Sequence, residues 1–199
     1  MRRSFRAACH PDAPTTRSGP VGRRNRRTTR LGIVVGFLIL SSGAAQPAVA
    51  LDPCLDLGLT LNRETTEVGE DVQVSVSLAN HCSVRSVDVY VVIVLPPTAA
   101  PSVGCPGSVA LVFVTNGGSA FALRCQSASV ATFPPFVADV TIPAAVDVTV
   151  HDLAAFTWPA GAPPGTYTIA IVATPPSAFA DGVLGPSDIL ALVARDLTN

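Results

Sequence analysis

Apolar and polar residues alternate strictly through residues 72–78, and this pattern constrains the fold more than any other feature of the chain. Val72, Val74, Val76 and Leu78 are separated by Gln73, Ser75 and Ser77. A period of two places every second side chain on the same face, which is typical of a half-buried β-strand. No segment of the chain is predicted to be a helix, so the sequence indicates an all-β fold.

Similar runs predict further short strands along the chain. They cover residues 57–61, 87–95, 109–115, 119–125, 137–142, 146–150 and 166–173. Residues 153–158 are predicted as another strand or an extended edge. Residues 189–194 have a propensity that also suits a short helix, but we predict a strand because residues 166–173 need a sheet partner.

The turn signals between these runs favour antiparallel pairing. Asn116-Gly117-Gly118 separates two of the runs, and Asn-Gly tolerates the positive φ that tight hairpins require. The sequence therefore predicts an antiparallel β-sandwich of about seven to nine strands.

The beginning of the chain has the layout of a secretory signal peptide. Arg23, Arg24, Arg26, Arg27 and Arg30 precede the apolar residues 31–40, and Ala48-Val49-Ala50 is a small-x-small cleavage signal. We therefore expect residues 1–50 to be a basic leader with a signal peptide and residues 51–199 to be one domain. An alternative is that residues 31–50 stay as a membrane anchor. The apolar stretch is shorter than the roughly 20 residues of a spanning helix, so we expect no membrane span in the mature form.

Cleavage would leave an acidic domain. Residues 51–199 contain four arginines, no lysine and thirteen acidic residues, a formal net charge of −9. Such a surface repels phosphate backbones and anionic lipids, so we predict that the domain does not bind nucleic acid.

Four cysteines remain after the leader: Cys54, Cys82, Cys105 and Cys125. An even number in an exported domain predicts two disulfides and a secreted or extracytoplasmic location, in a periplasm or at a cell surface. Among the three possible pairings we favour Cys54 with Cys82 and Cys105 with Cys125, because each pair is close in sequence and flanks two strands. Without a C-x-x-C motif, we expect no metal and no cofactor.

Motifs for catalysis are weak. His151-Asp152 with a serine would be needed for a triad, but His151 extends the outward row of Asp147 and Thr149, which indicates a solvent-facing strand end. The connection after residue 61 has four acidic residues, namely Glu64, Glu67, Glu70 and Asp71. They offer oxygen ligands for Ca²⁺, but without a D-x-D-x-D-G loop we interpret them as a solvated turn. Trp158 is expected to close one end of the core with Phe156, with a binding role as the alternative.

The segment from 156 to 169 resembles the late strands of bacterial immunoglobulin-like and fibronectin-like modules, which carry a P-x-G-x-Y turn. Residues 59–62, 68–72 and 87–91 resemble the first three strands of the same modules, so the resemblance covers most of residues 55–195. It implies an immunoglobulin-like sandwich in which Gly165 is the turn glycine and the Tyr167 hydroxyl bonds back to the preceding turn as a tyrosine corner. These motifs are structural, and the four cysteines are not required by such modules.

We therefore expect a secreted or surface-exposed module, not an enzyme, that contacts a protein or glycan. The loops 96–108, 126–136 and 174–187 are the expected contact surfaces, since a rigid scaffold holds them. The alternatives are a hydrolase built around His151, a protease inhibitor using the loop after Cys105, and a structural envelope component that associates through an edge strand.

Overall fold

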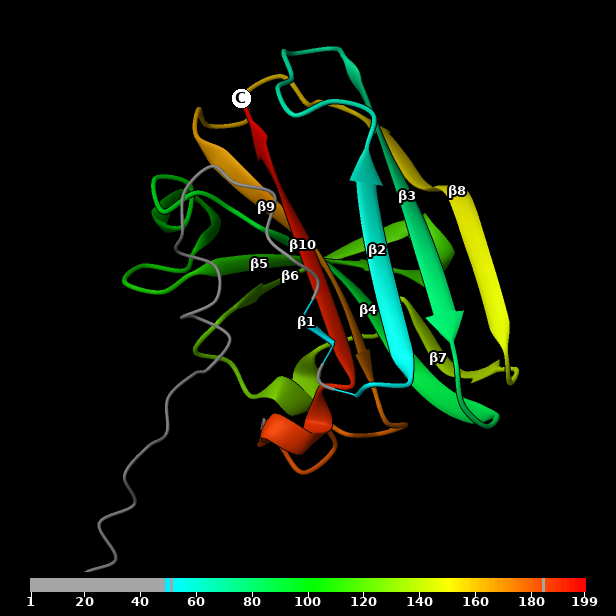
Figure 1. The fold of residues 1–199 in the computed structure, drawn as a ribbon. Coiled ribbons are helices and arrows are strands. Elements are labelled where there is room, and N and C mark those ends of the chain that lie inside the picture. The colour runs from blue at the N-terminus through cyan, green and yellow to red at the C-terminus, as the bar shows by residue number, and fades with distance from the viewer. Residues whose placement is uncertain (1–48, 51, 184) are drawn as a thin grey trace, which may run out of the picture. The chain divides into compact units, whose positions relative to one another are not determined.

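The structure is a computed structural model that describes residues 49–50, 52–183 and 185–199 (Figure 1). The predicted leader lies outside the described residues except for its last two positions. Strands dominate the described part, and the strands of each sheet pair in antiparallel fashion, so the predicted all-β antiparallel class is confirmed. The strands are β1 (Val49–Ala50), β2 (Leu55–Leu61), β3 (Asp71–Asn80), β4 (Arg85–Val94), β5 (Ala110–Thr115), β6 (Ala120–Cys125), β7 (Val137–Ile142), β8 (Val146–Thr157), β9 (Thr166–Thr174) and β10 (Ala191–Thr198).

Four short 3₁₀ turns complete the secondary structure. They are η1 (Pro101–Val103), η2 (Asn116–Gly118), η3 (Val130–Thr132) and η4 (Pro186–Asp188). Within the described ranges, no helix has the length and apolar character needed to cross a membrane.

The strands form a seven-stranded and a three-stranded sheet. The larger sheet has the order β1-β10-β9-β4-β5-β6, and the smaller has the order β2-β3-β8. Strand β4 pairs with β9 along one side. Along its other side, residues 91–94 pair with β5 and residues 85–89 pair with β7. Strands β5, β6 and β7 therefore all lie on the side of β4 that is opposite to β9.

One hydrophobic core contains buried side chains from both sheets. Leu59 and Val74 of the three-stranded sheet belong to the same cluster as Val91, Ile171 and Val193 of the seven-stranded sheet. All five side chains are almost fully buried. The alternation seen in the sequence thus directs one face of each sheet into a shared apolar interior. Burial of each large apolar side chain there contributes about 1.5–3 kcal/mol to the stability of the folded protein.

Strand β8 corrects one detail of the sequence prediction. The sequence predicts separate elements at residues 146–150 and 153–158, but Val146–Thr157 is a single strand. Both halves pair with the long strand β3, and the register shifts where Val74 faces Ala154 and Val76 faces Val150. Asp152 lies in this irregular segment with a φ of 53°, so a bulge absorbs the extra residues without ending the strand.

The β5–β6 turn follows the sequence prediction closely. Asn116, Gly117 and Gly118 all have positive φ values, of 51°, 64° and 98°. Asparagine and glycine reach this region at low cost, which explains why the turn occurs at this tripeptide. The last element is also a strand, β10, which extends to Thr198 and pairs with β9 as expected.

Candidate contact surface

The four cysteines are joined as favoured from the sequence. Cys54 is bonded to Cys82, and Cys105 is bonded to Cys125. The first disulfide joins the residue before β2 to a residue shortly after β3, and the second joins the connection before β5 to the end of β6. Each disulfide therefore closes a hairpin of two adjacent strands.

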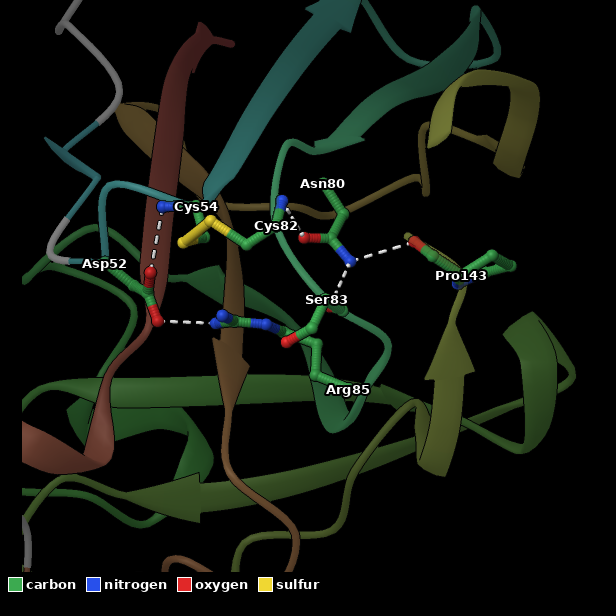
Figure 2. A network of polar contacts seen from close by, with 7 residues as sticks. All are labelled: Asp52, Cys54, Asn80, Cys82, Ser83, Arg85 and Pro143. Carbon is green, nitrogen blue, oxygen red and sulfur yellow. Dashed lines mark hydrogen bonds and ion pairs between the residues drawn. A yellow bond between two sulfur atoms is a disulfide. The ribbon is translucent and has the colours of Figure 1, made fainter. Parts of the chain in front are cut away.

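A polar network surrounds the first disulfide (Figure 2). The side chain of Asn80 is fully buried, and its Nδ2 donates hydrogen bonds to the carbonyl oxygens of Ser83 at 3.0 Å and Pro143 at 2.8 Å. The Cys82 N–H donates to Asn80 Oδ1 at 3.1 Å. Asn80 thereby links the β3–β4 connection to the β7–β8 connection.

Asp52 holds the other side of this network. Its carboxylate accepts a hydrogen bond from the Cys54 N–H at 2.9 Å and forms an ion pair with Arg85. The hydrogen bond from the Arg85 guanidinium, followed by that from the Cys54 N–H, lowers the pKa of Asp52 from its ordinary value of 3.8. The ion pair joins the chain before β2 to the start of β4, and thus connects the two sheets.

The Asp52→Asn variant should lose about 1–2 kcal/mol of unfolding free energy at neutral pH, because the hydrogen bonds to a charged acceptor are weakened. A lowered folded-state pKa means that this contribution is present above about pH 4 and is lost as the pH falls through the folded pKa. Urea unfolding at a series of pH values should therefore show wild type and variant converging in acid. Asp56→Asn is the control, because its pair with His81 is exposed. A difference that does not change with pH would contradict the assignment.

Tyr167 and Gly165 occupy the turn that the resemblance implied. The Tyr167 hydroxyl donates to the Pro163 carbonyl oxygen at 2.7 Å, which is the geometry of a tyrosine corner. Burial raises the pKa of the Tyr167 phenol. Gly165 has a φ of 145°, and a β-carbon there would lie 2.9 Å from the β-carbon of Pro96. The turn therefore needs glycine for both its conformation and its space.

Trp158 packs in the core beside this corner. Only 4% of its surface is exposed, and its ring meets the Tyr167 ring edge-on with centroids 4.7 Å apart. Phe156 lies near it, with centroids 6.2 Å apart. This placement agrees with the core role expected for Trp158.

The weaker site candidates lie apart from one another. His151 is exposed on β8. In the β2–β3 connection, Glu70 pairs with Arg63 and accepts a hydrogen bond from the Glu67 N–H, and Asp71 accepts one from the Thr157 hydroxyl. The Arg63 hydrogen bond is the main cause that lowers the pKa of Glu70. No group of three or more potential metal ligands occurs in the part of the chain that the structure describes.

Two of the three loops predicted as contact surfaces cover the outer face of the seven-stranded sheet. Phe133, from the 126–136 loop, lies 4.7 Å from Phe113 between ring centroids, and Phe179, from the 174–187 loop, lies 4.9 Å from Tyr90. These rings form a second apolar cluster on that face. Their aromatic side chains are thus used for packing, while a contact role for the three loops stays a prediction.

One side of the two sheets is closed by backbone hydrogen bonds. Strand β2 lies beside β10 (Figure 1). The Thr66 N–H donates to the Thr198 carbonyl oxygen, and the Thr198 N–H donates to the Glu64 carbonyl oxygen, both at 2.9 Å. These two bonds hold the β2–β3 connection, which belongs to the smaller sheet, against the end of β10 in the larger sheet.

Strands β6, β7 and β8 lie in the parts of the two sheets that are away from β10 and β2. The 143–145 connection carries the chain from β7 to β8, that is, from one sheet to the other. The β5–β6 turn also approaches β8, because a β-carbon on Gly118 would lie 3.7 Å from the Leu153 carbonyl oxygen. Strands β6 and β8 are the last strands of their sheets within the described residues.

Large apolar side chains are exposed along this side at positions that face the core. Phe121 and Leu123 on β6 pair with Val114 and Val112, which contact the core. Val137 on β7 pairs with Val89, and Val148 and Val150 on β8 pair with Leu78 and Val76, which also contact the core. Their exposed fractions run from 39% to 58%. We call this set the open edge, and its members are Phe121, Leu123, Val137, Val148 and Val150.

The open edge is not predicted by the sequence pattern. Phe121, Leu123, Val148 and Val150 read as ordinary inward positions of amphipathic strands. Whether an inward position is covered depends on which strands end each sheet, and alternation carries no information on strand order. The signal in the sequence is the alternation of Val146, Val148 and Val150 with the polar residues Asp147 and Thr149.

Comparison with known proteins assigns no family. No protein-family model and no curated protein matches the sequence. The immunoglobulin-like resemblance thus rests on the residues quoted above.

Comparison with solved structures gives only distant matches. The chain is similar to the alkylpurine DNA glycosylase AlkC of Pseudomonas fluorescens, bound to DNA containing an abasic site analog, with 10% identity over 73% of this chain and 31% of that chain and a TM-score of 0.39. It is also similar to the sporulation control protein Spo0M of Bacillus subtilis, with 12% identity over 73% of this chain and 49% of that chain and a TM-score of 0.37. A Niemann-Pick type C2 protein from the Japanese carpenter ant gives 9% identity over 72% of this chain and 88% of that chain and a TM-score of 0.33. The chain spans about a third of the first structure and half of the second, and likenesses this low carry no functional argument.

Proposed function

We propose that residues 51–199 are an exported immunoglobulin-like β-sandwich that acts by contact with another molecule, through the open edge, and not by catalysis. A protein is the partner class we favour over a glycan. The proposal has three supports: the disulfides, the arrangement of the sheets, and the exposed apolar residues.

The disulfides support an extracytoplasmic location. Such bonds persist in oxidising compartments and are rare where thiols are kept reduced. Cys54–Cys82 and Cys105–Cys125 account for every cysteine after the leader. Together with the basic and apolar layout of residues 23–50, they favour a secreted or surface-held product.

The shared core and the tyrosine corner support the immunoglobulin-like sandwich. Two antiparallel sheets contribute to one core, and Tyr167 bonds back to Pro163 as such modules do. The fold class alone does not specify a function, so the function must come from a surface.

The open edge is the observation that carries the proposal. Apolar side chains that gather on the surface of a water-soluble domain commonly mark a binding site, and we propose that the five side chains of the open edge form such a surface. The other exposed large apolar side chains of the described residues, Val68, Val84 and Val183, lie in connections between strands. Among the described residues, the large apolar side chains that are exposed on strands are therefore the five of the open edge.

Site-specific photo-crosslinking tests this proposal. Benzoylphenylalanine would replace Val148 or Val150 in the protein as its producing cells export it, with Val68 and Val183 as matched exposed positions in loops. We expect a discrete crosslinked product, identified by mass spectrometry, from the two β8 positions and not from the loop positions. Equal crosslinking from all four positions, or none from β8, would overturn the assignment of the open edge.

A further inference from the structure

The first half of β8, residues 146–150, is a regular strand at the end of its sheet. It pairs with β3 on one side, and no described strand pairs with its other side. A free strand edge presents backbone N–H and C=O groups that accept another strand. On the basis of the proposed function, we propose that this half of β8 binds an extended segment of a partner protein in which apolar and basic residues alternate.

The apolar half of this specificity comes from Val148 and Val150. They face the core side of the sheet, because they pair with Leu78 and Val76, and they are 41% and 44% exposed. In a strand added beside β8, every second side chain would lie next to these valines. An apolar residue at those positions would bury the exposed valine surface.

The preference for basic residues in the partner comes from the face of β8 that points away from the core. Asp147 and Thr149 are exposed and pair with Ala79 and Ser77, which point away from the core. The intervening side chains of an added strand would lie beside Asp147, where a lysine or arginine is favoured and an acidic residue is repelled. Strand β8 contains no lysine or arginine, and Asp152 adds a further exposed carboxylate on the same strand.

The same charges argue against a second copy of this chain as the partner. Residues 51–199 carry a formal net charge of −9, so two copies repel each other, and the β8 edges that would meet are themselves acidic. A partner segment with basic residues removes this repulsion.

Strand β6 is a poorer acceptor than β8. Its outward side chain Ala122 packs in the aromatic cluster, and Arg124 donates hydrogen bonds to the carbonyl oxygens of Leu123 and Thr132. Its end is held by the Cys105–Cys125 disulfide. The outward side chains of β6 therefore already contact other parts of the domain, whereas Asp147 and Thr149 on β8 are exposed.

Defined peptides test the chemistry of the partner. Fluorescein-labelled Lys-Val-Lys-Val-Lys-Val-Lys would be titrated with the exported protein and followed by anisotropy, beside a peptide with Glu in place of each Lys and one with the same composition but grouped residues. We expect the alternating basic peptide to bind at least about tenfold more tightly than either control, because only it matches both faces of β8. Its affinity should fall as salt is added, since exposed charges are screened.

Variants and amide exchange locate the binding. Val148→Lys with Val150→Lys should weaken binding by at least about tenfold, Asp147→Asn by about threefold, and the exposed-loop control Val68→Lys with Val183→Lys should leave it unchanged. Bound peptide should slow hydrogen exchange of the amides of residues 146–150.

Several outcomes would overturn the inference. Equal binding of the acidic peptide, binding without protection of residues 146–150, or a crosslink from Val150 to a second copy of the chain would each do so. If no peptide binds but the β8 positions still crosslink a partner, the contact function stands and only the partner chemistry fails. If both experiments are negative, both proposals fail, and the carboxylates serve only to keep the edge unpaired.

Discussion

Replacement of Cys54 and Cys82 by serine should lower the free energy of unfolding by about 3–4 kcal/mol, because the bond closes a loop between residues 28 apart in sequence. The bond also holds the ends of β2 and β3 beside the Asn80 network. Urea unfolding of the exported wild-type protein and the double variant would measure the difference. The variant should retain its β-sheet signal in circular dichroism, since both sheets share one core.

A reductant provides the control for this prediction. On reduction, wild type should lose the stabilisation from both disulfides. The double variant should lose only the contribution of the Cys105–Cys125 bond, whose two cysteines are 20 residues apart in sequence. If the double variant were as stable as oxidised wild type, the Cys54–Cys82 bond would not contribute to the folded state as the structure indicates.

The Asn80→Ala variant should lose about 3 kcal/mol, because a fully buried side chain with three hydrogen bonds is removed. The carbonyl oxygens of Ser83 and Pro143 would each lose the hydrogen-bond donor that Asn80 provides. Chemical denaturation measures the loss. Proteolysis of the native protein should also increase in the connections that Asn80 joins.

Asn62→Ala is the matched control for Asn80. Asn62 also links two backbone segments, through hydrogen bonds with Asp71 and Gln73, but it is exposed, and water replaces its bonds. We expect a loss of at most about 1 kcal/mol. Equal losses for the two variants would mean that burial is not the reason Asn80 matters.

The period-two alternation was sufficient to predict nearly every strand, because it reports directly which side of a strand is apolar. The β5–β6 turn was predictable for a local reason, since few residues other than asparagine and glycine adopt positive φ cheaply. The Tyr167 corner was implied by the resemblance. The continuity of β8 was not predictable, because it depends on the length of its partner β3.

The open edge and the Asn80 network depend on contacts between distant parts of the chain. Asn80 reads as a turn residue in sequence, yet its bond to Pro143 crosses 63 residues. The Asp52–Arg85 pair likewise joins segments whose proximity follows from the strand order. Local patterns contain no information about such contacts, so these features required the structure.

The placement of each disulfide within a hairpin has a consequence for how the chain matures. Strand pairs such as β4–β9 and β1–β10 join segments far apart in sequence, and such topologies fold slowly. The β2–β3 and β5–β6 hairpins need only local loop closure, so their thiols meet early. We therefore expect oxidation to join the correct cysteine partners before the remaining strands assemble, so that the native sheets form without reshuffling of disulfides.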